Sequence, residues 1–247
     1  MDYSVCNSER EECMMMTCKD CPREEGVQAF LELLDSVQSA SEEILYKQWV
    51  TTDRCTMITE VKILHEFLTS LSRKIANFAR HHFVAQKQAH YFKDLKENLP
   101  FHSEEVVVGD FSENFIFLVQ DAAQGFHYEN SQCTVHPFIV YFKSNGSHKL
   151  FHKSFCFLSD STKHNTVMVH TFISKLIPYL KVSLPNLKKI HYFSDGCVGQ
   201  YKNKYNFKNI CYHNEDYGLT CEWNFFATSH GKSACDRIGG TIKRATT

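Results

Sequence analysis

The sequence predicts an α/β fold in which a mixed five-stranded sheet is flanked by helices and preceded by a mainly helical region. Three observations predict it: apolar, β-branched runs after residue 100, an Asn-Gly turn between two of these runs, and helical periodicity between the later ones. The chain has 247 residues, of which 43% are hydrophobic, so it can bury a core of this size. We divide it into a cysteine-rich segment (1–25), a helical region (26–100) and a sheet domain (101–247).

The helical region is predicted from two sets of apolar residues. The first set recurs at helical spacing and comprises Val27, Phe30, Leu31, Leu34 and Val37; the second comprises Ile63, Leu64, Phe67, Leu68 and Leu71. The segment 70–99 contains neither glycine nor proline, which favours one long helix. Between the two sets, QWVTTDRCTMI is compatible with a short strand or with an irregular link.

The sheet domain begins with EEVVVGDF, a continuous run typical of a strand that is buried on both faces. NFIFLVQ is a second strand candidate. TVHPFIVYFK and KLFHKSFCFL flank Ser144-Asn145-Gly146-Ser147, and an Asn-Gly pair between apolar runs is a strong hairpin signal. The early strands therefore form an antiparallel meander.

The rest of the domain alternates between helices and strands. Residues 163–181 predict a helix that Pro178 would end or kink. KKIHYFSD and LTCEWNFFAT predict strands, whereas GQYKNKYNFKNICYH and KSACDRIGGTIKR predict helices. Strands that follow helices join a sheet in parallel by right-handed crossovers. This order of elements is that of the ribonuclease H fold.

Two aspartates follow predicted strands directly. Asp110 comes after Val106–Val108 and Asp195 after Ile190–Ser194, while Asp236 lies in the last helix. The first and fourth strands are parallel neighbours in this topology, so their carboxyl ends meet at one edge. Three converging carboxylates repel one another, and two divalent cations would relieve that repulsion. The alternative is that each aspartate forms a turn or caps a helix; Glu113, Asp121 and Glu222 are reserve acids.

The segments Val108–Phe115, Phe193–Asn203 and Thr228–Gly240 resemble the signature blocks of a transposon-encoded DDE/DDD transposase-like family, over roughly residues 13–244. The resemblance implies a ribonuclease-H-like, integrase-type core that cleaves DNA and transfers strands at transposon ends or target sites with two Mg²⁺ or Mn²⁺ ions. Asp110, Asp195 and Asp236 would be its acids. Compared with whole transposases, the sheet domain is expected to be truncated at its C-terminus.

Polar and basic residues near the acids are candidates for binding DNA or its phosphates: Gln200, Lys202, Asn203, His230, Lys232, Lys243 and Arg244. The long helix over 70–99 carries nine Lys, Arg or His residues and could line a DNA groove. The alternative in each case is a solvated surface or, for Gln200 to Asn203, the start of a helix. Gly239-Gly240 is expected to allow close helix packing.

Cys13-x4-Cys18-x2-Cys21 resembles half of a structural zinc site. A fourth ligand is needed, which Cys6 or Cys55 could supply; unligated thiols are the alternative. Most of the eleven cysteines lie in apolar segments of a chain that is not short, which favours free thiols in the nucleus or cytosol. The polar N-terminus does not resemble a signal peptide, and no run of 18 apolar residues predicts a membrane span.

Two functions follow. The first is an active metal-dependent DNA nuclease or strand transferase; the second is a catalytically inactive or domesticated transposase fragment that binds DNA or protein. A ribonuclease or exonuclease on the same fold is a weaker third. Homo-oligomerisation is compatible with all of them.

Overall fold

The computed structural model describes residues 5–22, 25–26, 29, 32–33, 43–117, 131–144, 149–228 and 234–245. It divides into two compact units, Met1–Gln86 and Lys87–Thr247, and helix α3 (Leu64–Glu97) contributes residues to both. The helix predicted from Val27, Phe30, Leu31, Leu34 and Val37 lies outside the described residues. Within the described part, no helix has the length and hydrophobicity needed to cross a bilayer.

The first unit contains the short helix α1 (Glu11–Met14), a β-hairpin and the first part of α3. Strands β1 (Glu43–Thr51) and β2 (Cys55–Ile63) pair antiparallel over nine residue pairs. The strand alternative for QWVTTDRCTMI is therefore confirmed in part, although the strands extend on both sides of that stretch, over residues that were expected to be mainly helical. The β-branched and aromatic residues of this stretch favour strands, and Ile63 ends β2 instead of opening the helix.

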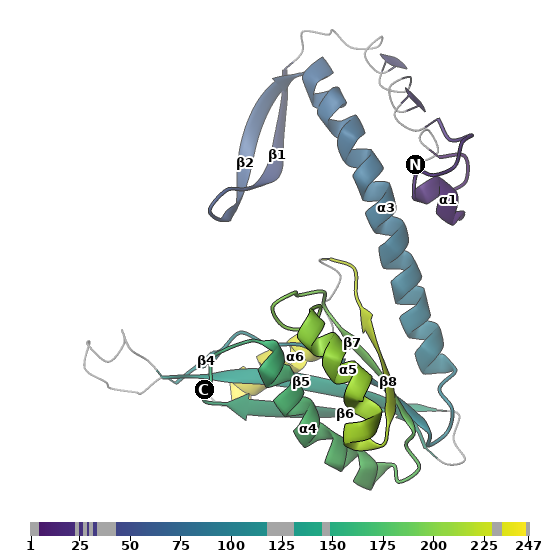
Figure 1. Ribbon diagram of the computed structural model, residues 1–247. Coiled ribbons are helices and arrows are strands. Elements are labelled where there is room, and N and C mark those ends of the chain that lie inside the picture. Colours follow the sequence, from purple (N-terminus) through teal and green to yellow (C-terminus); the bar gives the residue numbers. More distant parts are fainter. Residues whose placement is uncertain are drawn as a thin grey trace, which may run out of the picture. The chain divides into compact units, whose positions relative to one another are not determined.

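Helix α3 confirms the long helix predicted over 70–99, although it begins earlier. Its 34 residues run from Leu64 to Glu97 (Figure 1). Leu64 and Leu68 are buried against Ile44 and Phe67, as their helical spacing indicates. A helix this long owes its stability to such packing in each unit more than to intrinsic propensity.

The second unit is built on a mixed sheet. β3 (Glu104–Gly109) lies at its centre, antiparallel to β5 (Gln132–Lys143) and parallel to β7 (Lys189–Ser194). β6 (Leu150–Ser159) pairs antiparallel with β5, and β8 (Thr220–Phe225) pairs parallel with β7. The predicted mixed sheet, with its first and fourth strands as parallel neighbours, is confirmed. The Asn-Gly turn itself lies outside the described residues.

The predicted strand NFIFLVQ is much shorter in the structure. Only Phe115–Ile116 form a strand, β4, which pairs antiparallel with Cys133 and Gln132 of β5. Phe117 lies outside the strand, and residues 118–120 lie outside the described part of the chain. With β4 the sheet has six strands, although β4 contributes only two residues, which pair with one end of β5.

Helices cover both faces of the sheet (Figure 1). α4 (Thr166–Ser183) and α5 (Lys204–Tyr217) lie on one face, where Leu176 and Leu180 pack with Ile190 and Tyr192. α6 (Ala234–Ala245) lies on the other, where Cys235 joins Val106, Val108 and Phe193. Alternate residues of β3 and β7 therefore face different helices.

Of the two effects predicted for Pro178, an end or a kink, the structure excludes the end, because helix α4 continues to Ser183. The neighbours of this proline, Leu176, Ile177 and Leu180, are all buried in the core. Their burial offsets the hydrogen bond that the proline cannot make, a loss of about 3 kcal/mol in an unsupported helix.

Candidate functional site

Asp110 occupies the first position after β3, where the regular ladder to β5 stops. The register that pairs Gly109 with Phe138 places Asp110 opposite Pro137, and the Asp110 N–H donates to the Pro137 carbonyl at 3.4 Å. Proline has no N–H to return that hydrogen bond. The strand therefore ends here, while the Ser112 N–H still donates to the Val135 carbonyl at 2.9 Å and holds the segment against β5.

Gly109 makes this close approach possible. A Cβ atom at position 109 would lie 2.6 Å from the Phe138 ring, so a larger residue would push the strand end away from β5. Beyond the site the pairing shifts by one residue. From Gly109 to Phe115 the chain advances by six residues, whereas their partners Phe138 and Cys133 on β5 are five residues apart. Because the Ser112 N–H still donates to Val135 in the original register, the extra residue lies between Ser112 and Phe115 and forms a bulge a few residues beyond Asp110.

Asp195 is the counterpart of Asp110 on the neighbouring parallel strand. Val108 is in register with Phe193, so two residues further on Asp110 and Asp195 share one row. Both side chains are half-buried. The Asp195 Oδ1 also accepts a hydrogen bond from the Cys197 N–H at 3.1 Å. The turn-forming alternative is thus confirmed for Asp195, and this turn uses one of its two carboxylate oxygens.

Asp236 reaches the same area from helix α6, in whose first turn it lies. Three contacts set this helix against the segment that carries Asp110. The Cys235 thiol donates to the Val108 carbonyl at 3.5 Å, Gly239 packs on Ser112, and Lys243 forms an ion pair with Glu113 at 3.6 Å. A Cβ at position 239 would lie 2.5 Å from the Ser112 Oγ, so Gly239 serves close packing, as expected.

The charges of the three acids act on one another. Burial, followed by the negative charges of Asp195 and Asp236, raises the pKa of Asp110 to about 7. The three carboxylates are therefore close enough to interact through low-dielectric surroundings. They do not form a closed ligand cluster, however: in the described part of the chain, only a cysteine group has all its ligand atoms within 4.8 Å of one another.

A buried tyrosine that the sequence did not single out lies beside these acids. Tyr201 is 1% exposed, and its hydroxyl is 2.9 Å from Nε2 of His136. Burial and then the charges of Asp110 and Asp195 raise the Tyr201 pKa well above its usual value. Burial lowers the pKa of His136 to about 3, so this imidazole is neutral. An aromatic residue within the polar segment GQYKN was the available signal.

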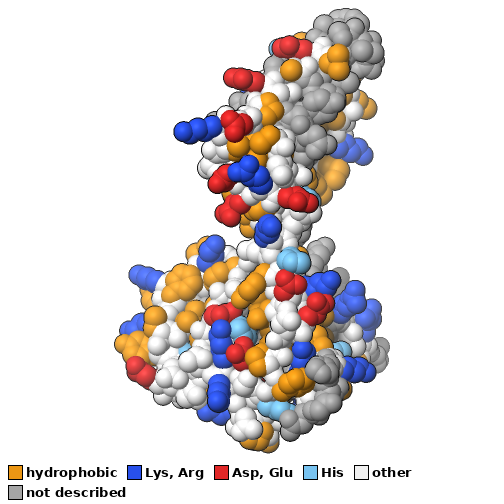
Figure 2. Space-filling model, turned by 90° about the vertical axis from the view of Figure 1, so that its right-hand side faces the viewer, with side chains coloured by type: hydrophobic (Ala, Val, Ile, Leu, Met, Phe, Trp, Pro, Cys, Tyr) orange, Lys and Arg blue, Asp and Glu red, His pale blue; other side chains and the backbone are white. Residues whose placement is uncertain are grey.

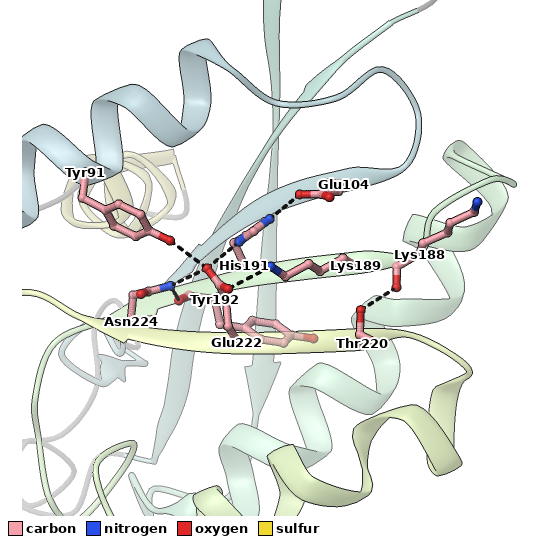
Figure 3. A network of polar contacts seen from close by, with 9 residues as sticks. All are labelled: Tyr91, Glu104, Lys188, Lys189, His191, Tyr192, Thr220, Glu222 and Asn224. Carbon is pink, nitrogen blue, oxygen red and sulfur yellow. Dashed lines mark hydrogen bonds and ion pairs between the residues drawn. The ribbon is translucent and has the colours of Figure 1, made fainter.

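Glu222, the sequence-based rival of Asp236, belongs to a different group of residues (Figure 3). Its carboxylate lies 2.6 Å from Nδ1 of His191 and 2.9 Å from the Lys189 Nζ, and it accepts a hydrogen bond from Tyr91 at 2.9 Å. On its other side His191 contacts Glu104 at 2.6 Å. Partial burial alone would raise the pKa of Glu222, but hydrogen bonds from Lys189, His191 and Tyr91 stabilise the charged carboxylate and lower its pKa to about 2.

This network lies away from the row of Asp110 and Asp195. His191 pairs with Val106 of β3 and with Glu222 of β8. It lies four residues before Asp195 on β7. At about 3.3 Å per residue, that is roughly 13 Å. Glu222 therefore does not share the site of the three aspartates. Of the other reserve acids, Glu113 is exposed and paired with Lys243, and Asp121 lies outside the described residues.

The predicted phosphate-binding residues differ in their surroundings. Asn203 caps α5: its Oδ1 accepts hydrogen bonds from Tyr205 and Asn206, and its Nδ2 donates to Thr166. The helix-opening alternative thus describes Asn203. The Lys202 side chain passes Gly196, next to Asp195, with its Cδ 4.0 Å from where a Cβ would be, and its ammonium lies over Phe225.

The remaining candidates stay predictions. The Gln200 carbonyl accepts a hydrogen bond from Thr166, while its side chain is half-buried. Lys243 is paired with Glu113, and Arg244 lies beside it in the last turn of α6. His230 and Lys232 lie outside the described residues.

Several basic residues of α3 have partners within their own unit. Lys74 donates to Gln48 at 2.6 Å and Arg80 to the Met15 carbonyl at 3.3 Å. His90 lies 3.0 Å from Asp94, and the Lys96 ammonium lies over Phe92. On the face shown in Figure 2, acidic and basic side chains lie among hydrophobic ones, in line with a net charge of −1. A DNA-contacting role of α3 stays a prediction.

The first unit holds a cluster of four cysteines. The Cys6 Sγ lies 3.4, 3.8 and 3.5 Å from those of Cys13, Cys18 and Cys21, and all four atoms fall within 4.8 Å of one another. Cys13, Cys18 and Cys21 are buried with Ala79 and Phe83 of α3. Cys55 is exposed in β2. Of the two predicted fourth ligands, the structure brings Cys6 to the cluster.

The thiols affect one another strongly. Hydrogen bonds with Cys13 and Cys21 raise the pKa of Cys6 to about 12, while a backbone hydrogen bond near Asp20 lowers the pKa of Cys18. The Cys6 N–H also points at the Cys21 sulfur at 3.4 Å. Four convergent sulfurs, one of them already accepting a backbone hydrogen bond, suit a tetrahedral soft-metal site.

The second unit therefore defines a mixed α/β protein with an acidic group at the carboxyl ends of two parallel strands. The chain belongs to the family described as Domain of unknown function DUF8701, whose model matches residues 88–247. A second model, Domain of unknown function DUF8700, matches residues 1–79. No curated protein matches the chain.

Among solved structures, the chain is similar to "Mos1 transposase paired-end complex with left transposon end", with 10% sequence identity and a TM-score of 0.37. The match covers 90% of this chain and 65% of that one, so the chain spans about two thirds of its length.

Proposed function

We propose that the second unit is a ribonuclease-H-like domain that cleaves DNA and transfers strands with divalent cations, as transposases do. The observation that carries this proposal is the convergence of Asp110, Asp195 and Asp236 from two parallel strand ends and one helix. The strand order β6-β5-β3-β7-β8, with only the first three strands antiparallel, supports the fold assignment. So do the sequence blocks around the three acids.

The acids have the donor chemistry that such cations require. Carboxylate oxygens are preferred ligands of Mg²⁺ and Mn²⁺, and Asp110 would lose its proton on binding because its pKa lies near 7. When bound, a pair of these ions would activate the attacking hydroxyl and stabilise the leaving oxygen of a phosphodiester. Asp195 would hold its place through the Cys197 N–H. Lys202, whose side chain passes Gly196 next to Asp195, would approach a phosphate of the bound DNA.

The test is nicking of supercoiled plasmid DNA by the full chain with Mn²⁺. Asp195→Asn keeps an oxygen for the Cys197 N–H but removes the charge, so we expect a loss of at least about a hundredfold. The matched control is Asp216→Asn, which changes an exposed aspartate of α5. Activity of the wild type should rise as the pH passes about 7, where Asp110 ionises. Equal nicking by Asp195→Asn would rule out the acid site.

The alternative is a catalytically inactive module that binds DNA or protein. The spread of the three carboxylates, which do not gather within 4.8 Å, favours it. The same assay separates the two: a wild type that binds plasmid DNA without nicking it supports the alternative. DNA as the target would place the protein in the nucleus, which we also propose.

We further propose that Cys6, Cys13, Cys18 and Cys21 hold a structural Zn²⁺ ion. Four thiolates at one point repel one another unless a cation compensates them, and Zn²⁺ with four cysteines is a common closed site. The purified chain should contain about one zinc per molecule by elemental analysis. Cys13→Ser should lose the metal, whereas the matched Cys55→Ser should keep it because Cys55 is in the hairpin. Zinc retained by Cys13→Ser would contradict the site.

A further inference from the structure

Helix α5 turns aromatic side chains outward and polar ones inward. The two residues that it buries are Asn206 and His213, whose side chains each contact a backbone carbonyl, at 2.8 and 2.7 Å. By contrast, Tyr205 is 63% exposed and Tyr212 46%. A helix that covers a sheet normally turns its aromatic rings to the core. These two tyrosines therefore do not serve the packing of the domain.

Lysines accompany both rings. The Lys204 ammonium lies 5.2 Å from the ring centre of Tyr205, and the Lys208 ammonium lies 5.9 Å from that of Tyr212. Residues four apart share a helix face, so Lys204, Lys208 and Tyr212 form one row, with Tyr205 beside it. We call these four residues the α5 stripe. It combines exposed ring faces with positive charge.

The positive charge of this surface is not neutralised within the protein. Between Asp195 and Glu215 the chain has three lysines, Lys202 and the two of the α5 stripe, and no acidic residue. All three are exposed, and none forms an ion pair in the part of the chain that the structure describes. Lys189 and Lys243, in contrast, are each paired with a glutamate. Unneutralised lysines on one surface attract an anionic partner.

The α5 stripe begins next to the acid site. The Lys202 side chain passes Gly196, the neighbour of Asp195, and its ammonium lies 5.5 Å from the ring centre of Phe225. Phe225 is in register with Ser194, the residue before Asp195. A third pair of lysine and aromatic ring thus connects the stripe with the carboxyl ends of β7 and β8.

We propose that the α5 stripe, with Lys202 and Phe225, binds an unpaired strand of nucleic acid that runs from the acid site. The lysines contact its phosphates and the rings stack on its bases, the combination by which proteins bind single strands of any sequence. Tyr205 and Tyr212 are seven residues apart, about 10 Å along the helix, which is the length of about three stacked nucleotides. The course of the strand rests on the proposed function, which places cleavage at the acids.

The rings decide between this partner and other polyanions. A duplex keeps its bases stacked inside and presents only their edges in its grooves, so the tyrosines would find no base to stack on. An acidic polypeptide would pair with the lysines but would likewise leave the rings without a partner. An unpaired strand uses both features of the stripe.

Fluorescence anisotropy tests the proposal with the full chain, a labelled oligothymidylate of about ten nucleotides and no added divalent cation. Tyr205→Ala with Tyr212→Ala should raise the dissociation constant at least about tenfold for the single strand and leave that for a duplex unchanged. Phe at both positions should keep the wild-type affinity because the rings remain. Tyr179→Ala, which changes a 61% exposed tyrosine of α4, is the matched control. An unchanged affinity of the double alanine variant, or an equal loss for strand and duplex, would overturn the proposal.

The salt dependence of binding gives a second measurement. Lys204→Gln with Lys208→Gln should reduce the slope of log affinity against log salt by about 0.7 for each lysine. Lys175→Gln, an exposed lysine of α4, should leave the slope unchanged. An oligouridylate of the same length distinguishes RNA from DNA as the source of the strand. Displacement of the strand by polyglutamate at an equal concentration of charges would contradict a role of the rings.

The outcomes for the wild type separate this proposal from the proposed cleavage. A chain that binds the single strand through the tyrosines but does not nick plasmid DNA would contradict cleavage alone. A chain that nicks plasmid DNA but does not bind the single strand would overturn the role of the α5 stripe alone.

Discussion

At the scale of single residues, the acid site depends on a proline from another strand. Pro137 removes the donor that would have continued the β3–β5 ladder, and the strand therefore ends at the residue before Asp110. The sequence indicated that Asp110 follows a strand, but not why the strand ends there. That explanation requires the register, which sequence periodicity alone does not provide.

Glu105 is a second residue with an unusual environment. It is 1% exposed in β3, its Oε2 has no hydrogen-bond partner in the described structure, and burial raises its pKa to about 8. The folded state therefore keeps the proton that the unfolded chain releases near pH 4.5. The contribution of Glu105 to the free energy of unfolding is therefore fully present below about pH 4.5 and is lost as the pH rises to about 8.

Glu105→Gln should remove most of this pH dependence. Relative to wild type, the variant should gain on the order of 3–4 kcal/mol of unfolding free energy between pH 5 and pH 8. Chemical denaturation at both pH values measures it. Glu215→Gln, an exposed glutamate of α5, is the control and should leave the profile unchanged. A parallel pH profile for Glu105→Gln would show that Glu105 ionises normally.

At the scale of elements, helix α6 places Asp236 through the contact of Gly239 with Ser112. Gly239→Ala should force the helix outward and cost about 1–3 kcal/mol. Gly240→Ala is a matched control because a Cβ there meets nothing within 4 Å, and it should stabilise the helix by up to about 1 kcal/mol. Thermal unfolding separates the two, and equal melting temperatures would contradict the packing.

Elements with strong periodicity were predicted well from the sequence. β3, β5, β6, β7 and β8, and helices α3 to α6, all fall within a few residues of their predicted positions. For the hairpin over 43–63 the sequence indicated at most a short strand, because its apolar residues alternate outward and its turn, Thr52–Arg54, lacks glycine and proline. Asp110 and Asp195 could be predicted as neighbours from topology, whereas Tyr201 and the fourth cysteine depend on contacts between distant segments.

At the scale of the whole molecule, the chain consists of two units, and each matches a different family model: one model covers residues 1–79 and the other residues 88–247. The division after Gln86 falls inside α3, not at residue 100 where the sequence suggested a boundary. The last turns of the helix belong to the second unit because Phe92 and Leu95 pack on Val106 and Phe193 of the sheet.

Removal of the proposed zinc ion should therefore affect the units unequally. The cysteine cluster is buried with Ala79 and Phe83, so a chelator should reduce amide protection in α1 and in α3 before Gln86. Protection in β3 and β7 should change little. Hydrogen exchange with mass spectrometry measures both regions in one sample. Equal loss of protection in both units would show that they unfold as one.

The shared row of Asp110 and Asp195 has an evolutionary consequence. Because strand side chains alternate between faces, inserting one codon between Val106 and Asp110 would turn this carboxylate toward α4 and α5, away from Asp236. Inserting two would restore its side but move it two residues along the strand, out of register with Asp195. A single-codon insertion in this strand should therefore disrupt the acid site while it leaves the run of valines in β3 hydrophobic.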